Sequence, residues 1–320
     1  IHLVFLPVFI FSICLPSSHV YAFQDSIHFT IQHYTDMNGL PQNSVKAIVK
    51  DREGFIWFST EDGLVRFDGK HFINFAKENT GLTSYRFHTI LQNRRDSSFV
   101  AANASAECLR IYNGTALKDS LFLEERKNIL TTIPWLYLPD YAGYGRSGEP
   151  DEINGLIHTG KDSVVLAGNS WLYAVLPGHI ETYADKKQQA VINCKISSAG
   201  RLFIFDDTLY YWDPSNRIHT FTGDGKHLET SLTGNISEEE AKRIKLYRSN
   251  FLESGVLVCT GERWYNLQKE GGKFVARMLI TNFSWKTNNI MGALYDPETN
   301  RLFLGSTTDG LFVFAFSPFT

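Results

Sequence analysis

The clearest pattern of apolar and polar positions in the chain lies at residues 54–68. Phe55–Ser59 is a run of strand-forming residues, Glu61-Asp62-Gly63 has the composition of a tight turn, and Leu64–Phe67 begins a return strand. This order of a strand, a turn and a second strand predicts a β-hairpin.

The same pattern returns near the C-terminus, at Leu302–Phe314. The two segments can be overlaid without a gap, and the identical pairs are Ser59/Ser306, Thr60/Thr307, Asp62/Asp309, Gly63/Gly310, Leu64/Leu311 and Phe67/Phe314. They are 247 residues apart, close to six steps of about 41 residues, and a period of that length is typical of β-propeller blades with four strands. We therefore predict an all-β protein, a β-propeller of four-stranded blades.

Six inner strand pairs can be read from the chain. They are Val45–Lys50 with Phe55–Thr60, Phe87–Leu91 with Ser98–Ala102, Ile153–His158 with Ser163–Gly168, Val191–Ile196 with Arg201–Phe205, Ile244–Tyr247 with Val256–Thr260, and Ile290–Tyr295 with Arg301–Ser306. The last unit continues with a third strand, Leu311–Phe316, and lacks a fourth. The strand at 27–34 has no hairpin partner, so we expect it to complete the last blade and to close residues 23–320 into one domain.

The number of blades does not follow from these pairs alone. Residues 23–320 at about 42 residues per blade correspond to about seven blades, so we expect a seven-bladed ring although six repeats are readable. The surplus lies mainly in residues 115–150 and 224–243. In the second segment, Ser237 followed by Glu240 is a capping box and predicts a short helix.

Residues 1–22 differ in composition from the rest. Leu3–Leu15 is a short apolar run, and Val20-Tyr21-Ala22 fits the small-x-small pattern of a cleavage site, so we interpret residues 1–22 as a secretory signal peptide and expect a periplasmic protein. The apolar run is too short to span a bilayer.

Charge and motifs narrow the function classes. The 320 residues carry a formal net charge of −3 without a basic block, which argues against nucleic acid as a partner. The histidines lack metal-ligand spacings, and neither a nucleophile elbow nor a phosphate-binding glycine loop is present, so we expect no metal and no cofactor. Trp57 lies in mid-strand and is interpreted as a core aromatic between blades.

Three segments together resemble a known repeat: 39–45 (GLPQNSV), 51–58 (DREGFIWF) and 62–69 (DGLVRFDG). They closely resemble the two-component regulator propeller repeat, which builds the periplasmic sensor regions of hybrid two-component systems in Bacteroidetes-type bacteria. The resemblance is specific over residues 27–76, returns at 290–316, and depends on blade periodicity between them. It implies a seven-bladed sensor ring, either the first propeller of a longer receptor with kinase modules or a stand-alone relative.

Blade topology indicates where a ligand would bind. If strands run outward from the axis, the connections that lead into the innermost strands and the turns between second and third strands share one face. On this face and its overhanging loops, the candidate ligand contacts are Asn43, Tyr85, Arg86, Trp135, Tyr144, Arg146, Asp151, Glu152, Trp171, Arg263 and Asn289. Aromatic faces with amides and arginines suit an oligosaccharide, whose rings stack and whose hydroxyls accept and donate hydrogen bonds.

Three functions are compatible with these residues. The first is a non-catalytic sensor that binds a small molecule or oligosaccharide and signals to kinase modules in cis or on a partner protomer, with a homodimer as a further expectation. The second is a secreted propeller lyase or glycosidase, for which Asp151 with Glu152 or Asp309 would supply the carboxylates. The third is a periplasmic protein–protein scaffold.

Overall fold

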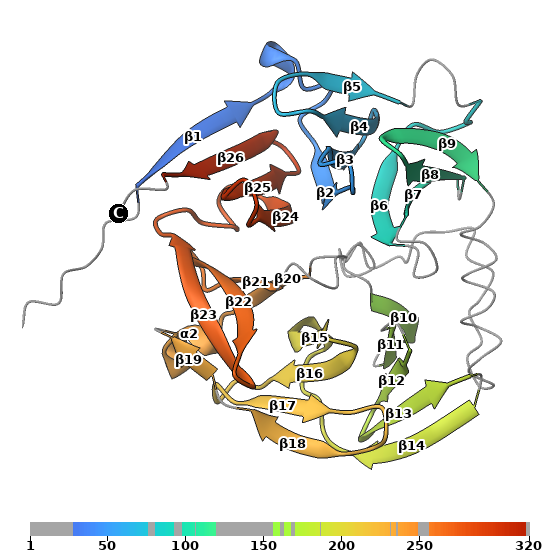
Figure 1. The fold of residues 1–320 in the computed structure, drawn as a ribbon, viewed down its shortest axis with the longest axis vertical. Helices are drawn as coiled ribbons and strands as arrows, with labels where there is room; N and C mark the ends of the chain where they lie inside the picture. The colour runs from blue at the N-terminus through green and yellow to red at the C-terminus, as the bar shows by residue number, and fades with distance from the viewer. Residues whose placement is uncertain are drawn as a thin grey trace, which may run out of the picture.

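The structure is a computed structural model. It describes residues 28–75, 81–92, 98–105, 107–119, 156–160, 163–167, 170–185, 187–230, 232–234, 236–248 and 256–317. Within these residues the strands form six sheets that lie around a common centre (Figure 1). In each sheet the inner strands lie toward the centre and the last ones toward the rim, as in a β-propeller. The predicted fold class, an all-β propeller with four-stranded blades, is confirmed.

The first two sheets each contain four antiparallel strands in chain order. The first comprises β2 (Val45–Lys50), β3 (Ile56–Thr60), β4 (Gly63–Phe67) and β5 (Phe72–Asn74). The second comprises β6 (Phe87–Gln92), β7 (Phe99–Asn103), β8 (Cys108–Tyr112) and β9 (Thr115–Asp119). Both predicted inner pairs are therefore present.

The third and fourth sheets follow the same plan with one additional strand in the third. The third comprises β10 (Leu156–Gly160), β11 (Ser163–Ala167), β12 (Leu172–Leu176), β13 (His179–Ala184) and β14 (Lys187–Asn193). The fourth comprises β15 (Leu202–Phe205), β16 (Thr208–Trp212), β17 (Ile218–Phe221) and β18 (His227–Thr230), preceded by the 3₁₀ turn η3 (Ala199–Arg201).

The predicted inner pair of Val191–Ile196 with Arg201–Phe205 is wrong. Val191–Asn193 belongs to β14, which pairs with β13 at the outer edge of the third sheet, whereas β15 pairs with β16. The outer edge strand alternates apolar and polar residues much as an inner strand does, so its sequence pattern resembles that of a blade start.

The fifth and sixth sheets each contain a strand out of chain order. The fifth comprises β19 (Leu232–Gly234), β20 (Lys245–Arg248), β21 (Val256–Cys259), β22 (Trp264–Glu270) and β23 (Lys273–Ile280), with β19 parallel to β23 at the rim. The predicted helix is α2 (Glu238–Ala241), and its capping box joins Ser237 and Glu240 in both directions.

The sixth sheet joins the two ends of the described chain. It comprises β24 (Ile290–Asp296), β25 (Arg301–Ser306), β26 (Leu311–Phe316) and β1 (Phe29–Tyr34), which is followed by the 3₁₀ turn η1 (Asp36–Asn38). β1 pairs antiparallel with β26 over its whole length, from Phe29 opposite Phe316 to Tyr34 opposite Leu311. The predicted pairing of the N-terminal strand with the last blade is confirmed. The count of seven blades stays a prediction, because residues 120–155 lie outside the described part of the chain.

The gapless overlay of the two hairpins holds only for their return strands. Thr60 pairs with Gly63 around a two-residue turn, whereas Ser306 bonds to Gly310 around three residues. Trp57 therefore corresponds in space to Phe303. Trp57 packs against the second sheet and Phe303 against the first, which in each case is the next sheet in the ring. The longer turn shifts the first strand by one residue.

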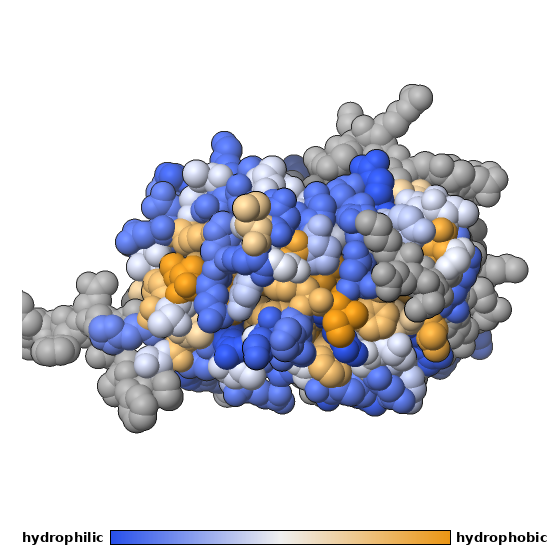
Figure 2. All heavy atoms as spheres, turned by 90° about the horizontal axis from the view of Figure 1, so that it is seen from above, coloured by the Kyte–Doolittle hydropathy of each residue, from blue (hydrophilic) through white to orange (hydrophobic). Residues whose placement is uncertain are grey.

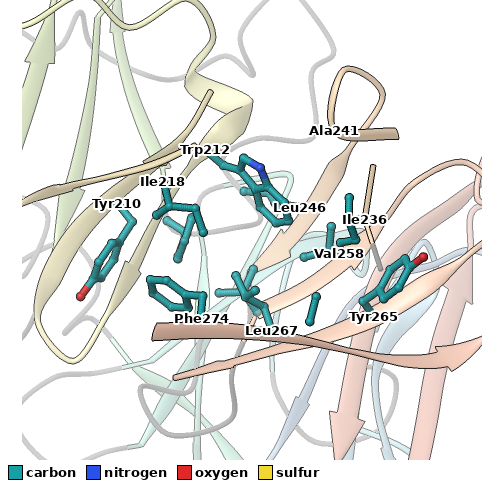
Figure 3. Packing of buried hydrophobic residues seen from close by; sticks show 13 residues of the cluster. Tyr210, Trp212, Ile218, Ile236, Ala241, Leu246, Val258, Tyr265, Leu267 and Phe274 are labelled. Carbon is teal, nitrogen blue, oxygen red and sulfur yellow. The ribbon is translucent and has the colours of Figure 1, made fainter. Parts of the chain in front are cut away.

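Hydrophobic clusters between consecutive sheets hold the ring together. The cluster between the first and second sheets includes Trp57, Phe87, Ile90 and Phe99, all fully buried, so Trp57 is the inter-blade aromatic that was predicted. Its indole Nε1 also donates a 2.7 Å hydrogen bond to Asp51 in the preceding turn. Figure 3 shows the cluster between the fourth and fifth sheets, which includes Tyr210, Trp212, Leu267 and Phe274.

The rim is mixed in character. Figure 2 shows apolar side chains among hydrophilic ones at the outer edge of the disc. Ile31 of β1, Ile73 of β5 and Leu117 of β9 are among the exposed apolar residues. Outer strands thus expose part of their apolar side chains, as soluble proteins commonly do.

Candidate functional site

The face predicted from blade topology exists in the structure. In the last sheet, the Asn289 side-chain amide, just before β24, donates to the Thr308 hydroxyl in the β25–β26 turn (3.1 Å). The Gly310 N–H of the same turn donates to the Asn43 carbonyl, just before β2 (2.8 Å). Connections into innermost strands and second-to-third-strand turns therefore lie side by side, within a blade and between neighbouring blades.

Four titratable side chains of the first two sheets meet on this face. Glu61, in the β3–β4 turn, accepts hydrogen bonds from Lys46 of β2 and from Nε of Arg86, which lies just before β6. The Nζ of Lys46 also lies 3.0 Å from Nδ1 of His88 in β6. We call Lys46, Glu61, Arg86 and His88 the inner cluster, and take it as the candidate ligand site.

β-bulges place two members of the inner cluster. The β2–β3 register skips Lys46, and the β6–β7 register skips His88, so each is the extra residue at the second position of an innermost strand. β24 has the same irregularity at Met291. A bulge re-aims a side chain and is common beside active sites. Three consecutive blades thus have a bulge at the same position, and the bulged residues are a lysine, a histidine and a methionine.

A close approach between blades fixes the backbone at Lys46. Gly292, next to the bulge of β24, lies against β2: a Cβ at this glycine would be 2.6 Å from the Lys46 carbonyl oxygen. Real Cβ contacts are never that short, so only glycine lets the two innermost strands approach this closely.

Burial and charge set the protonation states of the inner cluster. Burial lowers the pKa of the Lys46 ammonium, opposed by its hydrogen bond to Glu61. Burial by itself would raise the pKa of Glu61, but the hydrogen bonds from Lys46 and Arg86 outweigh it and lower that pKa. Burial and the positive charge of Lys46 lower the pKa of His88 to about 4, so this imidazole is neutral at physiological pH. Two cations therefore face one carboxylate and one neutral histidine.

Glu107, in the β7–β8 turn, holds the segment that carries Arg86. Its Oε2 accepts hydrogen bonds from the Thr83 N–H (2.8 Å), the Thr83 hydroxyl (2.9 Å) and the Asn103 amide (2.9 Å). The Asn103 amide also donates to the Ser84 carbonyl (2.6 Å). Burial opposes this arrangement, but the donors together lower the pKa of Glu107 to about 2. The carboxylate thus positions the loop just before Arg86.

Of the predicted contacts, Arg86 belongs to the inner cluster and Tyr85 is exposed beside it. Asn43 has a structural role: its side-chain oxygen accepts the Asp36 N–H (2.8 Å) and fixes the loop after β1. Asn289 also has a structural role. It adopts a positive φ of 50°, and its hydrogen bond to Thr308 joins the segment before β24 to the β25–β26 turn. Asparagine suits both tasks, because its amide bonds nearby backbone and tolerates this conformation.

Two other predicted contacts lie away from the inner cluster. Trp171, in the β11–β12 connection, is half-buried, and its ring packs so closely on Gly223 that a Cβ there would be 2.0 Å away. Arg263, in the β21–β22 turn, donates to Glu240 of α2 (3.0 Å). Both side chains contact their own parts of the fold rather than the inner cluster.

The remaining predicted contacts are Trp135, Tyr144, Arg146, Asp151 and Glu152, all outside the described residues. The candidate contacts in the overhanging loops and the Asp151–Glu152 pair therefore stay predictions. Asp309 is described, and its Oδ2 accepts the hydroxyl hydrogens of Thr308 (2.8 Å) and Ser306 (3.3 Å), which gives this carboxylate a turn-stabilising role.

The sequence analysis did not select Lys46 or His88, and it interpreted Glu61 only as part of a turn. The candidate contacts were placed in loops, whereas Lys46 and His88 are the second residues of β2 and β6. A detectable signal is the recurrence of an apolar residue, a variable residue and a small one at 45–47, 87–89 and 290–292. Among the described residues, no three histidine, cysteine, aspartate or glutamate side chains are grouped so as to hold a metal ion.

Comparison with known families identifies the repeat that carries half of this cluster. Residues 39–62, which include Lys46 and Glu61, match the family model described as the two-component regulator propeller. The chain carries a two-component regulator propeller repeat. The resemblance seen in the sequence is therefore confirmed at the segment where it was most specific.

Three similar solved structures come from two bacteria. Two are structures of the same extracellular domain, that of BT4673 from B. thetaiotaomicron. It is described in one as part of a one-component system (14% identity, TM-score 0.52) and in the other as part of a hybrid two-component system (15%, 0.50), and each match covers 91% of this chain and 43% of the other. The third is PorZ, a surface component of the type-IX secretion system of Porphyromonas gingivalis (12%, 0.50, 91% and 39%). At these identities the likeness shows the propeller fold, and the chain spans about two fifths of each relative.

No curated protein sequence matches the chain significantly. The described residues include no helix of the length and apolarity needed to cross a membrane.

Proposed function

We propose that the chain is an extracytoplasmic ligand-sensing domain of a two-component regulatory system, and that it binds an oligosaccharide on the face of the inner cluster. The carrying observation is that one segment, residues 39–62, both matches the regulator propeller family and supplies Lys46 and Glu61 of this cluster. The extracellular domain of BT4673, which has the same fold, supports the same assignment.

Signalling in this proposal requires kinase modules, in cis or on a partner protomer. A ligand shifts such a receptor only if it binds two arrangements of the receptor with different affinity. The propeller face would supply the ligand contacts, and residues 1–22 would direct export to the periplasm. The proposal treats the domain as non-catalytic and as binding no nucleic acid, metal or cofactor.

Thermal unfolding of the purified domain against a panel of neutral and acidic oligosaccharides tests this function. A ligand that binds only the folded state, at about 100 times its Kd, stabilises it by about 2.7 kcal/mol and raises the melting temperature. We expect at least one saccharide to do so. A panel without any stabilising saccharide would contradict the sensor proposal.

The enzyme alternative is separated by a second measurement on the same samples. A lyase or glycosidase would release new reducing ends from a polysaccharide, whereas a sensor leaves the chain length unchanged. New reducing ends that disappear on heat denaturation of the protein would replace the sensor assignment with an enzymatic one.

A further inference from the structure

β1 is an open outer edge of the ring. It is the last strand of the sixth sheet and pairs on one side only, with β26 (Figure 1). The Ser317 N–H donates to the His28 carbonyl (3.0 Å), and hydrogen-bonding direction alternates along an antiparallel strand. The N–H and C=O groups of residues 29, 31 and 33 therefore point away from β26. The His33 carbonyl accepts the Asn38 amide there (2.9 Å) and keeps a second lone pair.

The other outer strands in the described part of the chain carry features that discourage edge pairing. β5 and β19 have three residues each, β9 and β18 contain charged side chains, and the register of β14 with β13 shifts. Short length, charge and bulges all keep a sheet from extending into another molecule. β1 has six residues, no lysine, arginine, acidic residue or proline, and an unbroken register with β26. It is thus the outer strand best suited to accept a further strand.

The side chains of β1 complement themselves about a two-fold axis. An antiparallel register centred on residue 31 makes the outward backbone groups of two copies meet, and it places Ile31 opposite its own copy, Phe29 opposite His33, and Thr30 opposite Gln32. Apolar and aromatic side chains then share one face, and a hydroxyl and an amide share the other. Such cross-strand pairs stabilise a sheet, and no like charges are brought together. Ile31, which is 52% exposed, would be covered at the centre.

We propose that two copies of this chain associate through β1, in an antiparallel β1–β1 pair that joins their sixth sheets edge to edge. One pair of strands is smaller than the interface of roughly 1,600 Å² that is typical of stable complexes, so the dimer is weak, with a Kd of about 10–500 µM. The contact goes beyond the proposed function, since it supplies a partner protomer whether or not the face of the inner cluster binds a saccharide.

Sedimentation equilibrium of the purified chain, from about 1 to 500 µM, measures the association. Ile31→Lys sets two ammonium groups against each other at the centre of the pair, and we expect it to weaken dimerisation at least about 10-fold. Val191→Lys is the control, because Val191 is a β-branched residue of similar exposure (55%) on the outer strand β14. Monomer at every concentration, or a dimer that Ile31→Lys weakens no more than Val191→Lys does, would overturn the proposal.

Cysteine variants test the register of the pair. Residues directly opposite each other are about 5.5 Å apart between Cα atoms, within reach of a disulfide, whereas the two copies of Gln32 would be about 8 Å apart and beyond it. With copper–phenanthroline as a mild oxidant, Ile31→Cys should cross-link two copies and Gln32→Cys should not. Equal cross-linking of both variants would overturn the pairing centred on Ile31. Neither measurement involves a saccharide, so failure here leaves the sensor function standing.

Discussion

The Nζ of Lys50 lies 2.8 Å from Oδ1 of Asp296, and this ion pair joins the end of β2 to the end of β24. The Asp296 side chain is 4% exposed, and Lys50 also reaches Glu298 (2.6 Å). Since β24 belongs to the sheet that β1 completes, the pair links the first described blade to the last.

Replacement of Lys50 by methionine should destabilise the domain by about 1–3 kcal/mol, because it leaves a buried carboxylate without its cation. Urea unfolding measures the loss, and Lys70→Met, at an exposed position in the β4–β5 turn, is the control. A loss no larger than that of the control would show that the pair does not stabilise the ring.

The loss of stability caused by Lys50→Met should have a defined dependence on pH. Burial alone would lower the pKa of Lys50, but its bonds to Asp296 and Glu298 raise it above 10.5, so its contribution is lost only as pH rises through that raised value. Burial likewise opposes the lowered pKa of Asp296, whose contribution is lost as pH falls below 3.8. Between pH 5 and 9, roughly, the difference from wild type should stay constant. A difference that changes steeply within this window would contradict the assignment.

Trp57→Ala should cost about 3–5 kcal/mol, since it empties a fully buried position between the first two blades. Trp57→Phe keeps most of the volume but removes the donor to buried Asp51, so about 1–3 kcal/mol is expected. Denaturant unfolding of both variants measures the order of the two losses. A Trp57→Phe loss close to zero would show that the indole hydrogen bond contributes nothing beyond packing, whereas equal losses would show that packing contributes nothing beyond the hydrogen bond.

Glu107→Gln should destabilise the domain by about 1–3 kcal/mol near neutral pH and loosen the loop before Arg86. The pKa of Glu107 is depressed from 4.5 to about 2, so its stabilising contribution is present above pH 4.5 and disappears as pH falls toward 2. Stability curves of wild type and variant should therefore converge in acid. The exposed Glu262→Gln is the control, and hydrogen exchange at Thr83 and Ser84 reports the loop directly. Parallel curves down to pH 2 would argue against this role.

His88 should remain neutral across the physiological range, with a pKa of about 4. It should carry its proton on Nε2, because its Nδ1 lies 3.0 Å from the Lys46 ammonium, which can only donate. Nitrogen-15 NMR of the imidazole measures both the pKa and the tautomer. Lys46→Met should raise this pKa, because it removes a neighbouring positive charge while burial remains. A His88 that titrates near 6.5 in the wild type would contradict the electrostatics of the inner cluster.

The fold could be predicted largely because strand and turn signals in this chain are local. Phe55–Ser59 and Leu64–Phe67 are strand-forming runs on either side of the turn residues Glu61-Asp62-Gly63, and Ser237 with Glu240 marks α2 by capping chemistry alone. Val191–Ile196 was misplaced because an outer edge strand has the same local pattern as an inner one, and only pairing distinguishes them.

The site was harder to predict, because bulges depend on register between strands. Nothing in the pattern of β2 alone shows that Lys46 is skipped, and nothing in β6 shows it for His88. Arg86 was found because its loop position follows from blade topology. Asn43 and Asn289 share this position, but their amides bond the backbone and a neighbouring turn.

A crystal structure of the domain with a bound saccharide from the thermal screen tests the central claim most directly. We predict that the ligand lies on the face of the inner cluster. A ligand seated on the opposite face, or at the rim away from the first two blades, would contradict the account.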